Sequence, residues 1–185
     1  LTQYLAAGET VTATYTITVT DDSGTGNNTA TRDVTVVITG TNDTPTITVV
    51  DVNGAVTEDA SSPTLTDSGS VTFAEVDDTD ILTSSAVLAT TATTGPAIPS
   101  GLATALSSAL SLTQSGSNDG HIVWNFSLAN SLTQYLAAGE TVTATYTITV
   151  TDDSGTGNNT ATQNVTVVIT GTNDTPTITV VDVNG

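Results

Sequence analysis

The chain has 185 residues, of which 19 are acidic and only one, Arg32, is basic, giving a formal net charge of −18 at pH 7. Nucleic-acid binding needs cations that neutralise phosphates, so this charge excludes nucleic acid as a partner and disfavours anionic membrane surfaces. The absence of cysteine excludes disulfides, thiolate metal ligands and a cysteine nucleophile.

The sequence repeats itself. Residues 1–54 recur at 132–185, and the copies differ only where Gln163 and Asn164 replace Arg32 and Asp33. Self-similarity at a fixed spacing is typical of tandem repeats, so the predicted folding unit has about 131 residues. We expect 1–45 to be the C-terminal part of a preceding repeat, 46–176 to be one complete repeat, and 177–185 to be the first strand of a following repeat.

Alternation of threonine with apolar residues predicts strands. In residues 9–20, every second residue is apolar (Val11, Ala13, Tyr15, Ile17 and Val19), which indicates one buried and one exposed face. Residues 31–39 repeat this alternation. The turn formers "DDSGTGNN" between the two runs predict a hairpin, and the same hairpin is expected again in the second copy.

Further strands are predicted at 45–52, 71–76, 80–90 and 121–128. The exception is residues 99–110, where apolar residues recur at helical spacing behind Ser100, a possible N-cap, so a short helix is expected. Many short strands joined by turns indicate an all-β fold, an immunoglobulin-type β-sandwich in each repeat.

Four stretches occur in a fixed order: "GSVTFAEVDDTDI", "GHIVWNFSL", "LAAGETVTATYTITVTDDSGTGN" and "VTVVITGTNDTPTI". Together they resemble the VCBS-type, cadherin-like repeats of giant bacterial surface adhesins that type I systems secrete. The resemblance covers the whole repeat. It implies an extracellular module on the cell surface, stiffened by Ca²⁺, that extends an adhesive tip away from the cell.

The segment "GTNDTP" at 40–45 and 171–176 resembles the calcium-binding linker of cadherins. The resemblance implies that Asn42 and Asp43 share Ca²⁺ with acidic residues of the following module, while Asn173 and Asp174 hold half of a second site. The implied partners of the first site are Glu58, Glu75, Asp77, Asp78 and Asp80. Ligation by oxygen alone favours calcium over zinc. The alternative is that these residues are turn formers in solvated loops.

The two "DDSGTGNN" loops carry a weaker signal. Their opening, with Asp21 and Asp22 in the first copy and Asp152 and Asp153 in the second, resembles a calcium loop. Position 12 of an EF-hand frame, however, falls on Arg32 or Gln163 where glutamate is required. An ordinary turn explains the loops equally well, so both interpretations stay open.

The sequence favours a structural protein over an enzyme. His121 is the only histidine, and Trp124 alternates with apolar neighbours as a core residue does. No run of 18 apolar residues predicts a membrane span. The leading hypothesis is a calcium-rigidified extender; the alternative is a calcium-dependent carbohydrate-binding module. The expected partners are neighbouring repeats of the same chain or identical chains, joined by strand addition into a filament.

Overall fold

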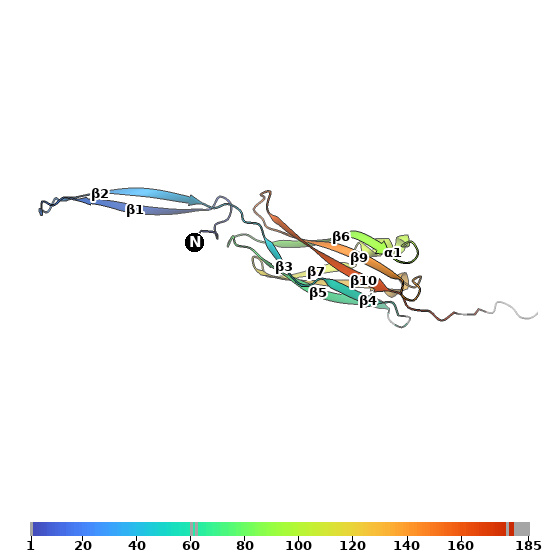
Figure 1. The fold of residues 1–185 in the computed structure, drawn as a ribbon. Coiled ribbons are helices and arrows are strands. Elements are labelled where there is room, and N and C mark those ends of the chain that lie inside the picture. The colour runs from blue at the N-terminus through green and yellow to red at the C-terminus, as the bar shows by residue number, and fades with distance from the viewer. Residues whose placement is uncertain (1, 60, 62, 177, 180–185) are drawn as a thin grey trace, which may run out of the picture.

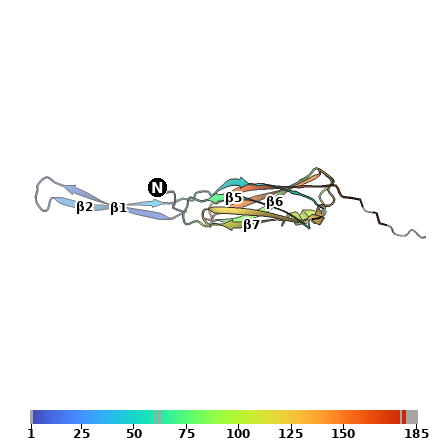
Figure 2. The same cartoon turned by 90° about the horizontal axis from the view of Figure 1, so that it is seen from below.

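The structure, a computed structural model, describes residues 2–59, 61, 63–176, 178 and 179. A long hairpin and a β-sandwich follow one another along an extended molecule (Figures 1 and 2). The predicted first strand of a following repeat, at 177–185, lies outside the described residues except for Ile178 and Thr179.

The hairpin consists of β1 (Thr10–Thr20) and β2 (Thr29–Thr39), which form a two-stranded sheet of their own. Their antiparallel register runs from Thr10 opposite Thr39 to Thr20 opposite Thr29 without a bulge. The connecting loop uses Gly24 at a φ of 66°, a backbone conformation that glycine adopts without strain. The predicted hairpin is therefore confirmed.

The sandwich is built from the remaining strands in two four-stranded sheets. The first sheet has the order β3-β5-β8-β7, and the second has the order β4-β10-β9-β6. The strands are β3 (Thr46–Asp51), β4 (Asn53–Thr57), β5 (Thr64–Ala74), β6 (Thr83–Thr93), β7 (Leu110–Ser115), β8 (Gly120–Ala129), β9 (Thr141–Thr151) and β10 (Thr160–Thr170). This division of strands between two packed sheets is that of immunoglobulin-type domains, so the predicted fold class is confirmed.

Strands β3 and β4 are one extended run that changes sheets. β3 pairs antiparallel with β5, and after a register shift between Val49 and Asp51 the chain crosses over, so that β4 pairs parallel with β10. The carbonyl of Asp51 accepts a 2.7 Å hydrogen bond from Trp124 Nε1 at this crossing. The sequence predicted a single strand at 45–52 and missed the crossing, because alternation alone does not tell which sheet a strand joins.

The core lies between the two sheets and follows the predicted alternation. Every second residue of β9, from Val142 to Val150, is buried, and Trp124 and Phe126 of β8 face them from the other sheet. The rings of Phe126 and Tyr146 meet edge to face with centroids 6.5 Å apart. Burying each such side chain contributes roughly 1.5–3 kcal/mol, so this layer supplies most of the driving force for folding.

The predicted helix is present but shorter than expected. Helix α1 (Ser100–Leu106) buries Leu102 and Leu106 against the core, and a 3₁₀ turn, η1 (Asn130–Leu132), precedes β9. The expected N-cap at Ser100 is wrong: the cap position is Pro99, with no side-chain cap bond. The helix ends where the Ser107 hydroxyl donates back to the Thr104 carbonyl at 2.6 Å, and β7 follows from Leu110.

Candidate metal centre

The segment Gly40–Pro45 connects the hairpin to the sandwich, and we call this region the joint. Two loops of the sandwich close on it: residues 75–80 after β5, and residues 152–159 between β9 and β10. The backbone N–H of Asp43 donates to Asp77 Oδ2 at 2.8 Å. Asn158 Nδ2 donates to the Asn42 carbonyl at 2.8 Å, so both loops hold the same short segment.

The base of the hairpin also contacts the 75–80 loop. The backbone N–H of Asp78 donates to the Tyr4 carbonyl at 3.1 Å, and the Thr79 hydroxyl donates to Glu9 Oε1 at 3.0 Å. The other carboxylate oxygen of Glu9 accepts from the Ala6 N–H at 3.0 Å, which fixes its orientation. The joint thus brings an acidic residue of the hairpin unit to the acidic loop of the sandwich.

Four acidic side chains at the joint are buried: Asp77 is 0% exposed, Asp152 3%, Asp80 6% and Glu75 7%. Four buried side-chain oxygens there have no hydrogen-bond partner, namely Asn42 Oδ1, Glu75 Oε2, Asp77 Oδ1 and Asp80 Oδ2. Leaving a buried polar group unpaired costs about 1–3 kcal/mol, and more when the group is charged. The unpaired oxygens of these side chains are therefore concentrated in one place, at the joint.

The pKa values of two acidic side chains at the joint are raised. Burial raises the pKa of Asp80 above its ordinary value, and the like charges of Asp152, Asp77, Asp153 and Glu9 raise this pKa further. Burial is also the main cause of the raised pKa of Glu75. Hydrogen bonds from the Val76 and Asp77 N–H groups lower this pKa, and the charges of Asp77 and Asp152 raise it. The single basic side chain, Arg32, lies opposite Ile17 in the half of the hairpin next to its loop.

The donor set fits a hard cation. Among the described residues, no three acidic, histidine or cysteine side chains alone form a ready metal shell. An ion at the joint would therefore also take oxygens of other kinds, and the unpaired amide oxygen of Asn42 is one of these. Carboxylate, amide and carbonyl oxygens in flexible loops are the ligands that calcium accepts.

The prediction that Glu58 lies with the acidic residues of the joint is wrong. Glu58 lies at the opposite end of the sandwich, beyond β4, where it is 0% exposed. Its Oε2 accepts from the Thr172 N–H at 2.8 Å, and its Oε1 accepts from Gln134 Nε2 at 2.8 Å. Because β4 runs parallel to β10, Glu58 is brought to the end of β10 and hence next to the second "GTNDTP" segment.

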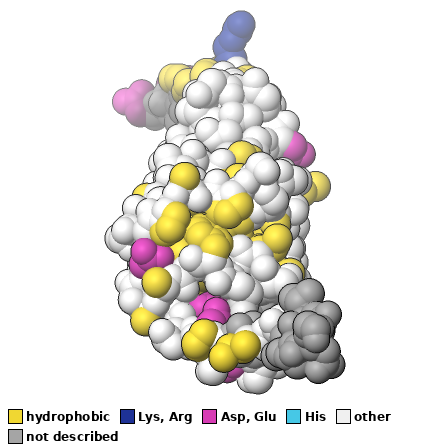
Figure 3. Space-filling view, turned by 90° about the vertical axis from the view of Figure 1, so that its right-hand side faces the viewer, with side chains coloured by type: hydrophobic (Ala, Val, Ile, Leu, Met, Phe, Trp, Pro, Cys, Tyr) yellow, Lys and Arg dark blue, Asp and Glu magenta, His cyan; other side chains and the backbone are white. Residues whose placement is uncertain are grey.

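The remaining residues predicted from the linker resemblance lie in two places. Asp43 is half-buried and Asp78 exposed at the joint. Asn173 and Asp174 are exposed at the far end, where Asn173 Nδ2 donates to the Asp174 carbonyl at 3.0 Å, as Asn42 does to Asp43 at 2.6 Å. Figure 3 looks onto this far end, where apolar and acidic side chains both reach the surface.

The two copies of the "DDSGTGNN" loop have different environments. Asp152 is buried at the joint, where its Oδ2 accepts from Asn42 Nδ2 at 3.3 Å, and Asp153 Oδ1 accepts from the Ile81 N–H at 2.9 Å. Asp21 and Asp22 are exposed in the loop at the tip of the free hairpin. The loop geometry itself is shared: Asp21 and Asp152 each accept from the serine N–H two residues later at 2.9 Å.

Sequence reasoning missed three residues of the joint. Glu9 lies next to the 75–80 loop, Asn158 holds the linker, and Asn118 Nδ2 donates to the carbonyls of Asp77 and Asp80 at 2.7 and 3.2 Å. Glu9 and Asn118 are single polar residues, just before β1 and between β7 and β8, and Asn158 lies inside the "DDSGTGNN" loop but is not one of its acidic residues. Only the packing of the loops brings them together.

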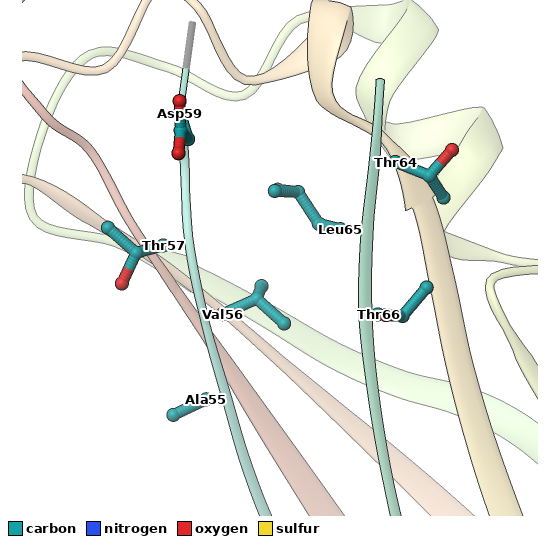
Figure 4. Close-up of a pocket in the computed structure, with 7 residues that line it drawn as sticks. All are labelled: Ala55, Val56, Thr57, Asp59, Thr64, Leu65 and Thr66. Atoms are coloured by element: carbon teal, nitrogen blue, oxygen red, sulfur yellow. The ribbon is translucent and has the colours of Figure 1, made fainter. Parts of the chain in front are cut away.

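A separate surface depression of about 340 Å³ opens between β4 and β5 (Figure 4). Val56 and Leu65 lie between the two strands, and Asp59 lies toward one end. Its lining residues are Ala55, Val56, Thr57, Asp59, Thr64, Leu65 and Thr66. None of them is aromatic, so the depression offers no ring on which a sugar stacks.

His121, the only histidine, is exposed at the second residue of β8, opposite Thr72 and Ser115. Within the described residues, no helix has the length and apolar character needed to cross a membrane.

No protein-family profile and no curated protein matches the sequence. Among solved structures, the fold is similar to the cadherin-like domains 1 to 4 of zebrafish RET, with a TM-score of 0.37 and 13% identity over 90% of this chain and 32% of that one. It is also similar to CfaE, the adhesive subunit of CFA/I fimbria of enterotoxigenic Escherichia coli, with a TM-score of 0.41 and 14% identity over 89% of this chain and 59% of that one. At these scores neither likeness carries an argument about function.

Proposed function

We propose that this chain is part of an extracellular, calcium-stiffened extender of a bacterial surface adhesin, with Ca²⁺ bound at the joint. The observation that carries the proposal is the set of four unpaired, buried oxygens of Asn42, Glu75, Asp77 and Asp80. They lie where the hairpin unit meets the sandwich, in a chain with one basic residue. Without a cation, this arrangement of buried like charges is unfavourable.

The residues that would hold the ion come from three segments. Asn42 belongs to the linker, Asp77 and Asp80 to the loop after β5, and Asp152 to the loop between β9 and β10. A bound divalent cation supplies the positive charge that offsets their mutual repulsion. Because the two loops belong to the sandwich and the linker belongs to neither of its sheets, these ligands would fix the linker against the sandwich and remove a hinge.

The expected affinity is modest. Extracellular calcium modules bind with Kd values around 10⁻⁴–10⁻³ M. At about 1 mM calcium, one such site stabilises the joined state by roughly 0.4–1.4 kcal/mol. Stiffness of this origin is lost when calcium falls, which is the expected mechanism of an extender that functions outside the cell.

The test is titration calorimetry of the full chain with CaCl₂, because the repeat provides a matched pair of variants. Asp152→Asn removes a buried carboxylate at the joint, whereas Asp21→Asn removes the same residue from the same local sequence at the exposed tip. We expect millimolar calcium uptake in the parent chain and in the Asp21→Asn variant, and its loss with Asp152→Asn. Absence of uptake in the parent, or equal effects of both variants, contradicts the proposal.

No specific observation favours the carbohydrate-binding alternative. Four of the five aromatic side chains of the sandwich lie in the core: Trp124 is 0% exposed, Phe126 and Tyr146 are 1%, and Phe73 is 3%. The fifth, Tyr135, is half-buried and packs against the core. The extended molecule in Figures 1 and 2 has the shape of a spacer. Specific binding of the full chain to one glycan class on a glycan array would favour the carbohydrate-binding module over the extender.

A further inference from the structure

A buried carboxylate at the far end of the sandwich lies between a hydroxyl and a carboxamide. The side chain of Glu58 is 0% exposed. Its Oε1 accepts from Gln134 Nε2 at 2.8 Å, and its Oε2 lies 3.4 Å from the Thr172 hydroxyl oxygen. The two oxygens of one carboxylate therefore face two different side chains, one of which is a nucleophile and the other an acyl group.

Three segments that are distant in sequence form this arrangement. Glu58 follows β4, Gln134 lies between η1 and β9, and Thr172 follows β10. The Thr172 hydroxyl also donates to the Glu58 carbonyl at 3.1 Å, and the Thr172 N–H donates to Glu58 Oε2 at 2.8 Å. The backbone N–H of Glu58 donates in turn to the Thr170 carbonyl at 2.9 Å. These contacts hold the hydroxyl against the carboxylate.

A carboxylate in this position can carry a proton from one group to the other. A hydroxyl becomes a nucleophile when an adjacent base takes its proton, and an amide nitrogen becomes a leaving group when it gains one. Glu58 accepts hydrogen bonds from both side chains, as an ionised carboxylate does. One residue thus contacts both the nucleophile and the leaving group of an acyl transfer.

We propose that Thr172 and Gln134 form an intramolecular ester bond, with Glu58 as the catalytic residue. Glu58 Oε2 takes the hydroxyl proton while Thr172 Oγ1 attacks Gln134 Cδ. The bond between Cδ and Nε2 then breaks, and the nitrogen leaves as ammonia with the proton that Glu58 delivers from its Oε1 side. A hydroxyl and a carboxamide become an ester and ammonia, and Glu58 returns to its starting form, so no further reactant is needed.

Gln134 provides the movement that this step needs. Reacting atoms must approach to about 3–3.5 Å before the bond forms. Gln134 is exposed, and within the described part of the chain its side chain is held only through Nε2, by Glu58 and, at 3.5 Å, by the Asn130 carbonyl. Rotation about its side-chain bonds brings Cδ toward Thr172 Oγ1 while Glu58 and Thr172 keep their places.

The composition gives such a bond a structural use. The chain has no cysteine for a disulfide, and its single basic residue is Arg32, so no lysine is present to form an amide crosslink. An ester from Gln134 to Thr172 would close the loop that contains β9 and β10, the two central strands of their sheet. Such a crosslink restricts the unfolded chain as a disulfide does. The inference does not use the calcium site, so a failure of calcium binding leaves it intact.

The repeat supplies an internal control. Gln3 and Thr41 occupy the matching positions of the first copy, and they line the same small cavity. Both are exposed, and among the described residues neither side chain is hydrogen-bonded to a carboxylate. Because this pair lacks the contact with a glutamate, we expect it to stay unreacted. The full chain should therefore lose one molecule of ammonia and not two.

The experiment is intact mass spectrometry of the denatured, purified 185-residue chain. We expect a mass lower than that of the sequence by one ammonia molecule, and peptide mapping should recover Gln134 and Thr172 in one crosslinked species. Mild alkali, which hydrolyses esters, should separate the two peptides and add one water. The loss of ammonia should disappear in Gln134→Ala and Thr172→Val, and it should persist in Thr172→Ser and in the control Gln3→Ala.

The variant Glu58→Gln tests the catalytic role. We expect it to have the full mass while still unfolding cooperatively on heating, and an ester that forms in this variant overturns the role of Glu58. A parent chain of full mass overturns the proposal. So does a loss of ammonia that persists in Gln134→Ala, because a succinimide at an asparagine followed by glycine, such as Asn53, is then its source.

Discussion

At the residue scale, one tight contact in the core involves a glycine. The indole of Trp124 lies over Gly69 of β5, so that a Cβ added to Gly69 would lie 2.5 Å from Trp124 Cζ2 and 2.8 Å from the Asp51 carbonyl oxygen. That oxygen accepts the indole N–H at 2.7 Å, which keeps the ring from moving aside. The crossing of β3 into β4 therefore depends on a residue without a side chain.

We expect Gly69→Ala to lower the free energy of unfolding by about 1–3 kcal/mol, the usual cost of overpacking a core. Denaturant unfolding monitored by Trp124 fluorescence measures it. Gly157→Ala is the control, because no atom lies within 4 Å of a Cβ at that loop position. Equal stability of the two variants contradicts the close packing of the indole on Gly69.

Tyr146 makes the stability of the sandwich depend on pH above about pH 10. Burial raises its pKa from 10.0 to about 12, so the unfolded chain loses the phenol proton before the folded chain does. The contribution of Tyr146 to stability is thus fully present below pH 10 and is lost as the pH rises from 10 to about 12. Burial and the charge of Glu140 also raise the pKa of Tyr135, so the titration needs both variants. Ultraviolet titration should show an ionisation step near pH 12 that is lost in Tyr146→Phe and kept in Tyr135→Phe. Persistence of that step in Tyr146→Phe would contradict its assignment to Tyr146.

At the element scale, the repeat places one strand sequence in two environments. Ile17 on β1 is 53% exposed, whereas Ile148, the same position of β9, is 0% exposed. Ile148→Ala should lower the free energy of unfolding of the sandwich by about 2–5 kcal/mol, because it removes buried methylenes and leaves a cavity. Ile17→Ala should change it by no more than about 0.5 kcal/mol. A comparable loss in both variants would mean that the hairpin unfolds together with the sandwich.

The elements also show what sequence can and cannot predict. Alternation predicts β9 and the hairpin of β1 and β2, because the pleat itself has a period of two residues. It does not predict the crossing between β3 and β4, or the short strand β7 that starts where the helical spacing still continued to Leu110. Those outcomes are decided by pairing with strands that are distant in sequence.

For the candidate site too, the sequence predicts some residues and only the structure shows the others. The resemblance to cadherin linkers predicts a site at Asn42 and Asp43 with the "AEVDDTD" loop, and the hydrogen bond from the Asp43 N–H to Asp77 brings these two segments together. Glu58 was assigned to the wrong end, because its position depends on the parallel pairing of β4 with β10. Glu9 and Asn158 come from other loops of the same joint, and only the assembled structure shows them there.

At the scale of the whole molecule, the hairpin and the sandwich meet through the linker and few other contacts. Two hydrogen bonds outside the linker join the two bodies: the Asp78 N–H donates to the Tyr4 carbonyl, and the Thr79 hydroxyl donates to Glu9. The acidic side chains beside these bonds repel one another. Without a cation we therefore expect bending at the joint. With calcium bound, the linker and both loops would share one ligand shell, and the angle between the two bodies would be fixed.

This prediction is measurable because the chain has no native cysteine, so two introduced cysteines carry spin labels at defined places. Thr18 of β1 and Thr113 of β7 are exposed and lie on opposite sides of the joint. Pulsed electron paramagnetic resonance should give a broad distance distribution in chelator and a narrow one at millimolar calcium. Asp77→Asn should keep it broad at that concentration, because Asp77 is buried at the joint, whereas Asp22→Asn, at the exposed tip, should narrow like the parent chain. A distribution that calcium leaves unchanged would mean that the ion, even if bound, does not stiffen the molecule.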